Sequence, residues 1–402
     1  MANDALLNAK QQRNDEFYTV YEYIQKEMNA YLEYNPDVFK DKVILCPCDD
    51  PEWSNFTKFF AQNFETLGIK KFISTSYAMV AKKEKYELYH QMTMFETSYP
   101  QYDKKKAQSK GKIFVLEKDT NGNGKIDIDD LEWNYLEGDG DFRSEEVSKL
   151  RDEADIIVTN PPFSLFREFV AWILEKDKKC ILIGQIGMAT YKEIFPEIKN
   201  NRLWIGATCN SSDMVFEVPE GAIVKPKDRE KAAKMGYVGN YTRQGNACWF
   251  TNIDHGRRHA PLELMTMADN LKYSRHKELK EKGYIPYFNY DGIDIPYVDA
   301  IPSDYEGVMG VPTSFLDKYN PEQFEIVDNG AYAPKTMVHT VVGDTIQYIK
   351  DGETVWSTPY TVSERKAGNG LRLNVNGLPG SLPYGRILIR KRGVNNENNT
   401  NN

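Results

Sequence analysis

Hydrophobic residues in the first half of the chain recur with helical spacing in three places. Spacings of three and four predict a helix within residues 4–39, with an apolar face made by Phe17, Val20, Tyr21, Ile24 and Met28. A second helical pattern covers residues 54–67 and should end at Gly68, and a third covers residues 165–174.

Short continuous apolar runs lie between these helical patterns and predict buried strands. They cover residues 43–46, 70–75, 155–159 and 179–183. Strands that alternate with helices favour an α/β fold, here a doubly wound, Rossmann-like parallel sheet. Ligands of such sheets bind beyond the carboxyl ends of the strands, so residues 46–51 and 160–163 are expected to share one site.

The pattern changes after about residue 206, where glycine, proline, tyrosine and basic residues increase. We therefore predict a first domain over residues 1–205, with an acidic insertion at about 100–137, and a mixed α+β region over residues 206–392. Short strands are expected at residues 338–342, 345–349, 371–375 and 386–390. The asparagine-rich residues 393–402 predict a disordered tail.

Composition excludes several classes of protein. The chain has 402 residues, of which 41% are hydrophobic, so wholesale disorder is excluded. Its apolar runs are far shorter than the ~20 residues of a membrane-spanning helix, and the first residues lack a leader pattern. Five cysteines without zinc-site spacing predict reduced thiols and a cytoplasmic protein without a membrane partner.

The net charge of −8 by itself argues against a nucleic-acid partner. However, residues 119–155 hold 13 acidic and 4 basic residues, a local charge of −9, so the rest of the chain sums to about +1. The acidity therefore belongs to one stretch and does not exclude an anionic partner elsewhere.

The motif Asn160-Pro161-Pro162-Phe163 directly follows a predicted buried strand. An exocyclic amino group on a base is a poor nucleophile because its lone pair is delocalised into the ring. The Asn160 side-chain oxygen and the Pro161 carbonyl could accept hydrogen bonds from that group and localise the lone pair, while Phe163 stacks on the base. Pro162 would keep the loop rigid. The structural alternative is a turn that merely ends the strand.

Residues 154–168, which contain this motif, resemble the catalytic segment of the EcoRI-type adenine-specific DNA methyltransferase family. Further segments similar to that family occur in family order, and the likeness spans residues 10–392: 15–19, 48–51 with 54–56, 138–144, 248–252, 305–312 and 386–390. The resemblance implies methyl transfer from S-adenosylmethionine to N6 of an adenine flipped out of double-stranded DNA. It also implies residues 206–392 as the target-recognition region.

The resemblance further suggests a monomer in a bacterial or phage-infected cell, with a cognate restriction endonuclease acting on the same site. Two alternatives stay open at this point. One is an RNA or protein-glutamine N-methyltransferase, and the other is a catalytically silent DNA-binding relative.

Cofactor contacts are expected at three segments and at Asn160. The glycine-free turn after the first strand offers Asp49 or Asp50 to the cofactor's ammonium group, and the likeness includes Pro51 and Asn55. Capping of the next helix is the alternative role for this turn. By resemblance, the methionine end would contact Phe17, Tyr18 and Thr19, which pattern alone assigns to a helix core.

Asp139, Asp141 and Phe142 suit an adenine ring, since a carboxylate can accept from its amino group while an aromatic side chain packs on its face. A solvated acidic turn is the alternative. The second predicted strand ends in Ser74-Thr75-Ser76, so no residue is assigned to the ribose.

Residues 119–130 have the spacing of a calcium loop, with Gly124 at its sixth position. The predicted ligands of a structural Ca²⁺ are Asp119, Asn121, Asn123, Lys125 and Asp130. A glycine-rich hairpin turn is the alternative, because an apolar strand pattern precedes the loop.

Residues 221–284 carry 13 basic and 7 acidic residues, a local charge of +6. Such a stretch is often only a solvated face, but downstream of a base-modifying sheet it suits phosphate contacts. The predicted DNA-binding residues in and beyond it are Arg243, Arg257, Arg258, Arg275, Arg386 and Arg390.

Overall fold

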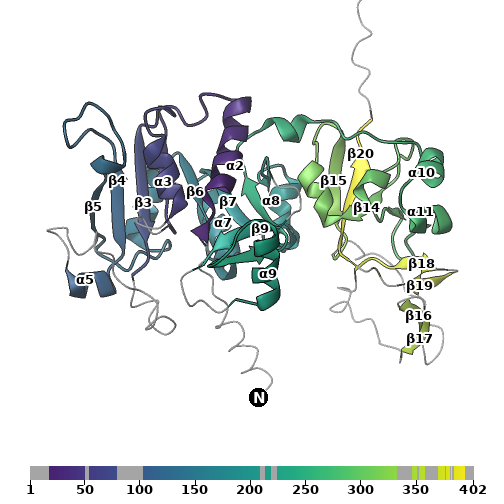
Figure 1. Cartoon of the computed structure of the whole chain (residues 1–402). Helices are drawn as coiled ribbons and strands as arrows, with labels where there is room; N and C mark the ends of the chain where they lie inside the picture. Colours follow the sequence, from purple (N-terminus) through teal and green to yellow (C-terminus); the bar gives the residue numbers. More distant parts are fainter. Residues whose placement is uncertain are drawn as a thin grey trace, which may run out of the picture. The chain divides into compact units, whose positions relative to one another are not determined.

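The computed structural model describes most of the chain, and its contacts divide it into two compact units. Unit 1 comprises residues 1–194 and 203–256, and unit 2 comprises residues 195–202 and 257–402 (Figure 1). The described residues are 18–49, 54–78, 103–208, 213–218, 224–332, 346–350, 353–357, 370–375, 377–380, 382 and 384–393. Phe17, Asp50, Pro51, the predicted strand 338–342 and residues 394–402 of the predicted tail lie outside them.

Four parallel strands form the centre of unit 1, as the apolar runs predict. Their order in the sheet is β3-β2-β6-β7, and all three neighbouring pairs are parallel. Their bounds are β2 (Val43–Cys46), β3 (Lys71–Ser76), β6 (Ile156–Thr159) and β7 (Lys179–Gln185). Because β2 and β6 are adjacent, the loops that follow them leave the sheet side by side.

Antiparallel strands extend this quartet on both sides into an eight-stranded mixed sheet, ordered β5-β4-β3-β2-β6-β7-β11-β8. The added strands are β4 (Lys112–Leu116), β5 (Glu132–Tyr135), β11 (Ala247–Thr251) and β8 (Trp204–Ile205). β11 is buried throughout and pairs with β7, with Cys248 opposite Gly184. The structural division therefore lies at Gly256, some fifty residues beyond the expected boundary at 205.

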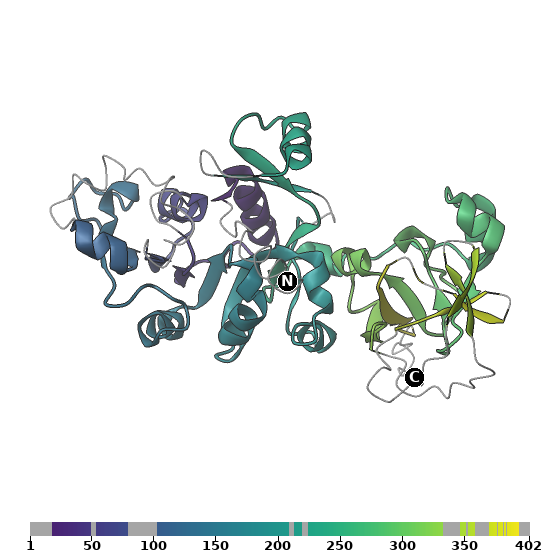
Figure 2. The ribbon, with the colours of Figure 1, turned by 90° about the horizontal axis from the view of Figure 1, so that it is seen from below.

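Helices cover both faces of this sheet. α2 (Tyr21–Tyr34) and α3 (Asn55–Gln62) lie on one side, whereas α6 (Glu145–Glu153) and α7 (Phe166–Leu174) lie on the other (Figure 2). The observed α2 ends earlier than predicted, since Asn35 adopts an extended conformation. Ser54 caps the start of α3, since its hydroxyl accepts a hydrogen bond from the Phe56 amide.

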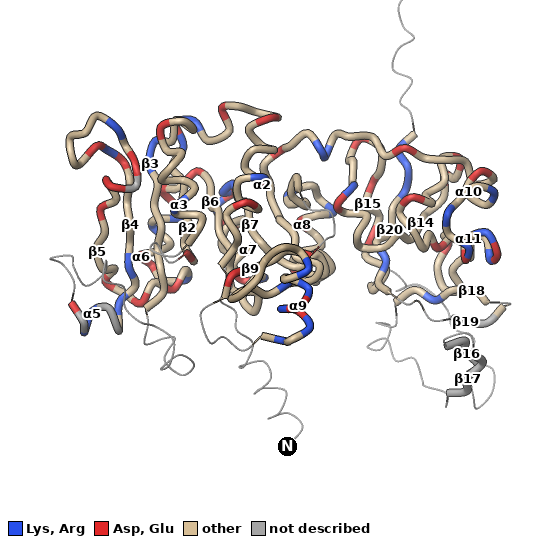
Figure 3. The backbone as a smooth tube through the Cα atoms, viewed as in Figure 1, with Lys and Arg blue, Asp and Glu red and all other residues tan. Residues whose placement is uncertain are grey.

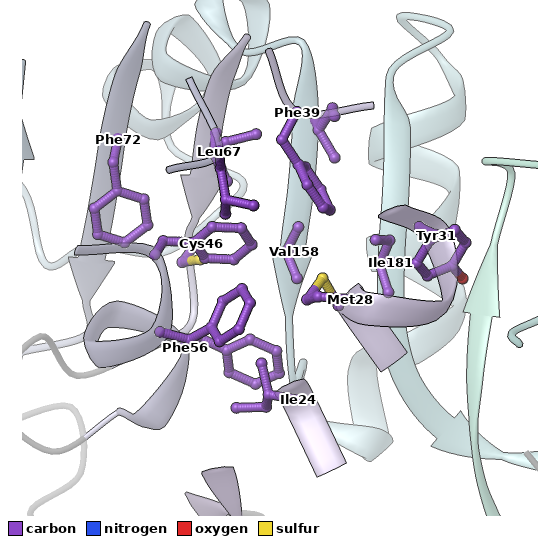
Figure 4. Packing of buried hydrophobic residues seen from close by; sticks show 14 of the residues in the cluster. Ile24, Met28, Tyr31, Phe39, Cys46, Phe56, Leu67, Phe72, Val158 and Ile181 are labelled. Carbon is purple, nitrogen blue, oxygen red and sulfur yellow. The ribbon is translucent and has the colours of Figure 1, made fainter. Parts of the chain in front are cut away.

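The predicted apolar faces of α2 and α3 form the core with the sheet (Figure 4). Ile24 and Met28 of α2 are fully buried, and Phe56 of α3 is 1% exposed. They pack with Val158 and Ile181, which project from the same face of β6 and β7. The helical periodicity therefore predicts the buried face of both helices correctly.

A small three-stranded sheet completes the part of unit 1 that bears on the site. Its order is β1 (Tyr18–Thr19), β9 (Met214–Glu217) and β10 (Tyr241–Gln244), all antiparallel. Helix α9 (Pro226–Lys234) lies between β9 and β10 in the chain. The short helix α5 (Lys104–Ser109) precedes β4.

Unit 2 contains two further sheets. The five-stranded sheet, ordered β12-β13-β14-β20-β15, comprises β12 (Ile285–Pro286), β13 (Ile293–Asp294), β14 (Met309–Pro312), β20 (Arg386–Lys391) and β15 (Phe324–Asn329). The four-stranded sheet, ordered β17-β16-β19-β18, comprises β17 (Glu353–Ser357), β16 (Ile346–Lys350), β19 (Leu378–Gly380) and β18 (Leu373–Val375). Its helices are α8 (Phe195–Lys199), α10 (Met267–Tyr273) and α11 (Lys277–Lys282).

Three of the four strands predicted for this region are present: β16, β18 and β20. The rest of the chain includes short 3₁₀ helices at Ile128–Asp130, Phe163–Leu165, Ile186–Thr190, Gly256–His259, Val298–Ala300 and Thr313–Lys318. Within the described ranges, no helix has both the length and the apolar character needed to cross a bilayer.

Candidate active site

Asp49 stands just beyond the carboxyl end of β2 and is only 6% exposed. Its carboxylate accepts hydrogen bonds from the hydroxyls of Ser54 (2.9 Å) and Thr159 (2.5 Å). Its backbone carbonyl accepts a third bond from the Ser74 hydroxyl (3.1 Å). One residue thus joins the carboxyl ends of β2, β6 and β3, where a ligand of a parallel sheet is expected.

The Asn160-Pro161-Pro162-Phe163 motif leaves the sheet directly after Thr159, the residue bonded to Asp49. Asn160 is half-buried and Pro161 is buried. Pro162 accepts a hydrogen bond from the Leu165 amide (2.9 Å), which closes the short 3₁₀ turn that starts at Phe163. The half-buried Phe163 ring packs against the main core. Two prolines and a packed ring hold the loop in one conformation, as the chemistry of a positioned acceptor requires.

The segment around Asp141 also lies near this edge of the sheet, as its electrostatic effect on Cys48 indicates. Burial raises the pKa of the Cys48 thiol, the negative charges of Asp49 and Asp141 raise it further, and a hydrogen bond to Thr159 opposes them. Asp141 therefore lies close enough to act on Cys48 electrostatically. The Asp141 segment, about ninety residues from Asp49 in the sequence, therefore lies near this edge of the sheet.

The loop over residues 138–142 reaches the edge by packing on the end of β3. The Asp139 carbonyl accepts a hydrogen bond from the Ala78 amide (2.7 Å). Gly140 has φ +83°, and a Cβ there would lie 2.2 Å from the Ser76 carbonyl oxygen, so only glycine fits. Burial raises the pKa of Tyr77, and Asp139 and Asp141 raise it further. A carboxylate thus lies beside the strand end for which the sequence suggested no acidic residue.

The other members of this loop have partners within the protein. Asp141 accepts two hydrogen bonds from the Arg143 guanidinium (2.7 and 2.9 Å), and these, with other contacts, lower the pKa of its carboxyl group. Phe142 is buried and packs edge-on against Phe169 (5.0 Å between ring centroids) and Trp172 (5.5 Å) of α7. In this conformation the Phe142 ring belongs to the core rather than to an open binding surface.

Tyr18 and Thr19 form strand β1, not the helix core that pattern alone suggests. The Thr19 carbonyl accepts a hydrogen bond from the Asn55 side chain (2.8 Å) at the start of α3. This contact holds β1 beside the turn that follows β2. Two predicted cofactor segments are therefore neighbours.

The calcium-like loop is a connection between the antiparallel strands β4 and β5. Its side-chain oxygens accept backbone hydrogen bonds: Asp119 from Gly122 and Gly124, and Asp130 from Thr120, Asn121 and Asp127. Asn121 and Asn123 bond to the amides of Asn123 and Lys125. Across the described ranges, no three His, Cys, Asp or Glu residues are grouped to hold a metal. The calcium expectation is not supported, and the hairpin alternative describes the loop.

The arginines predicted to contact DNA are engaged within the protein. Arg386 is buried and forms an ion pair with Asp294 (2.7 Å), and the buried Arg258 donates to Asn201. Because neither side chain reaches the surface in this structure, we withdraw both from the DNA-contacting set. The other four form ion pairs with these partners: Arg243 with Asp213, Arg257 with Asp317, Arg275 with Asp299 and Arg390 with Glu325.

Comparison with known proteins adds to this geometry. A family model described as "Adenine-specific methyltransferase EcoRI" matches residues 5–392. The chain is 40% identical over 326 residues to the Type II methyltransferase M.EcoRI of Escherichia coli, which covers 81% of this chain and 89% of that protein. It is 34% identical over 321 residues to M.MpnI of Mycoplasma pneumoniae, covering 80% and 84%.

A third relative is the Type II methyltransferase M.MgeORF184P of Mycoplasma genitalium. It is 32% identical over 387 residues, which is 96% of this chain and 98% of that protein. No solved structure matches the chain.

Proposed function

The chain belongs to the EcoRI family of adenine-specific methyltransferases, and we propose from this premise that the edge of the sheet holding Asp49 and Asn160 is its active site. The enzyme methylates adenine at defined sites in DNA. The observation that carries the proposed location is the 2.5 Å hydrogen bond from Thr159 to Asp49, which joins the proposed catalytic loop to the proposed cofactor turn.

Asn160 and Pro161 are the proposed catalytic residues. The Asn160 side-chain oxygen and the Pro161 carbonyl accept hydrogen bonds from the two N–H groups of the adenine amino group, which localises the nitrogen lone pair. The nitrogen bonds to the methyl carbon, the carbon–sulfur bond of the donor breaks, and a proton then leaves to solvent. Phe163 stacks on the flipped base, and Pro162 holds the loop.

The residues at this edge fit S-adenosylmethionine, which supplies an activated methyl group. Asp49 offers a carboxylate to its ammonium group, with Asn55, Tyr18 and Thr19 around the methionine end. Asp139, bonded to the end of β3 through its carbonyl, suits the ribose hydroxyls, and Asp141 suits the adenine amino group. Gly140 allows a close approach of backbone at this point.

The parallel quartet with helices on both faces supports a doubly wound, Rossmann-like methyltransferase domain, which we place in unit 1. We assign target recognition in double-stranded DNA to unit 2. The Type II designation of the relatives supports a cognate endonuclease acting on the same sequence. We further propose that the enzyme acts as a monomer in the cytoplasm of a bacterium or of a phage-infected cell.

The test is to incubate the protein with labelled S-adenosylmethionine and duplex DNA, RNA or protein in parallel. We expect label on duplex DNA alone, and digestion to nucleosides should release N6-methyladenine. Label confined to RNA or protein would contradict the proposal. The sequence context of the methylated adenines then identifies the recognition site.

A further inference from the structure

Helix α9 of unit 1 is rich in basic residues. Residues 225–234 hold five basic and two acidic side chains, a net charge of +3. Lys225, Lys227, Arg229 and Lys234 are exposed. Figure 3 marks basic positions along α9 in blue. Among the described residues, none of these four forms an ion pair. Their charges differ in this respect from the arginines predicted earlier, each of which has an internal partner.

One of the two acidic residues of this segment is already neutralised. Asp228 forms an ion pair with Arg243 (3.5 Å), which also pairs with Asp213 (2.5 Å). Glu230 is the acidic group that remains exposed on the helix. The basic side chains therefore dominate the outward surface of α9.

Three contacts fix α9 to the rest of unit 1. It connects β9 and β10, which pair along four residues. Just after the helix, the Tyr237 hydroxyl donates to Glu22 (2.8 Å) in the first turn of α2, and its ring stacks on Tyr23 (6.5 Å between centroids). The Arg243 ion pairs add a third tether. A surface held in this way loses little conformational entropy when it binds a partner.

The same contacts place the helix near the proposed active site. β9 pairs with β1, and the Thr19 carbonyl of β1 accepts from Asn55 beside the turn after β2. Figure 1 shows α9 directly beside β9, near α2. A duplex whose adenine enters the Asn160 loop extends beyond that loop along its own axis.

We propose that α9 is a phosphate-binding element, in which Lys225, Lys227, Arg229 and Lys234 contact the backbone of the DNA substrate. This inference rests on the proposed function, because it takes duplex DNA as the ligand. Exposed, uncompensated lysines and arginines suit phosphates, and such contacts position a duplex without reading its sequence.

The experiment measures binding to a fluorescently labelled duplex of 30 base pairs and arbitrary sequence at 50, 100 and 200 mM salt. The variant combines Lys227→Gln, Arg229→Gln and Lys234→Gln. The matched control combines Lys40→Gln, Lys70→Gln and Lys176→Gln, three exposed lysines in loops that precede strands, at the opposite edge of the sheet. Circular dichroism and the affinity for S-adenosylmethionine, measured by calorimetry, verify that each variant is folded.

Each lost phosphate contact reduces the slope of log affinity against log salt by about 0.9, so the α9 variant should lose about two to three units of slope. Its affinity at 100 mM salt should fall at least about tenfold, while the control binds as the unaltered protein does. The substitutions Lys227→Arg and Lys234→Arg should preserve binding. An unchanged salt slope in the α9 variant would overturn this inference but leave the proposed function intact. Failure of the unaltered protein to bind any duplex would overturn the proposed function as well.

Discussion

Two buried carboxylates, Asp49 in unit 1 and Asp294 in unit 2, differ in the donors that surround them. Asp49 accepts from the hydroxyls of Ser54 and Thr159. Asp294 accepts two bonds from the guanidinium of Arg386 (2.7 and 3.1 Å) and one from the Tyr287 hydroxyl (2.8 Å). The Arg386 guanidinium balances the Asp294 charge inside the fold, whereas the Ser54 and Thr159 hydroxyls are neutral donors that orient the Asp49 carboxylate. The guanidinium pair of Asp294 stabilises the fold, whereas the hydroxyl-bonded carboxylate of Asp49 suits a cationic ligand.

The largest effect is expected at Asp294. Asp294→Asn leaves the Arg386 guanidinium buried beside a neutral amide, and breaking a buried pair costs about 3–5 kcal/mol of unfolding free energy. Urea denaturation measures this loss. As a control, Arg390→Gln removes the exposed pair with Glu325 and should cost at most about 1 kcal/mol. Equal, small losses in both variants would show that burial of the pair has no energetic consequence.

Asn160→Ala should lower the methylation rate by about 10²–10³, because it removes one positioned acceptor. Affinity for DNA and the unfolding free energy should stay nearly unchanged. The exposed Asn200→Ala serves as the control. A turnover rate equal to that of the unaltered enzyme would remove Asn160 from the mechanism. The proposed site around Asp49 and Asn160 would then lack its catalytic residue.

Asp49→Asn tests whether the Asp49 carboxylate binds a cationic group of the cofactor. The amide oxygen can still accept from one of the Ser54 and Thr159 hydroxyls, and the amide NH2 can donate to the other, but the side chain carries no charge for an ammonium group. We expect the dissociation constant for S-adenosylmethionine, measured by calorimetry, to rise about tenfold, which corresponds to about 1.4 kcal/mol. Folded Asp294→Asn protein should bind the cofactor normally. A normal affinity in Asp49→Asn would reduce Asp49 to a structural link between strands.

The smallest effect concerns Asp141, whose pKa is lowered chiefly by its hydrogen bonds to Arg143. A lowered pKa stabilises the fold above the unfolded-state pKa of about 3.9, and the contribution disappears as the pH falls through the folded-state value. The pair is partly exposed, so Asp141→Asn should cost below about 1 kcal/mol at pH 6. Unfolding of both proteins at pH 6 and pH 3 should show this difference shrinking at low pH; a constant difference would contradict the assignment.

The helices, strands and candidate site of unit 1 could largely be predicted from sequence because their signals are local. The apolar runs identify β2, β6 and β7, the helical spacing identifies the buried face of α2, and two prolines mark the loop after β6. The family resemblance, which the comparisons confirm, added the chemistry to these positions. The predicted boundary at 205 differs from the structural division because β11 pairs with β7. This pairing joins residues about seventy positions apart, which no local sequence pattern records.

Sequence alone therefore determined the family and the reaction and predicted the segments of the proposed active site, since each depends on short motifs and on periodicity. Only the tertiary structure decided how charges are used. It buried Arg386 against Asp294, brought Asp139 to the end of β3, and left the lysines of α9 exposed near the site. The physical reason is that the partner of a charged side chain is set by long-range packing. Identical residue types in one basic stretch can thus stabilise the fold or remain available to a ligand.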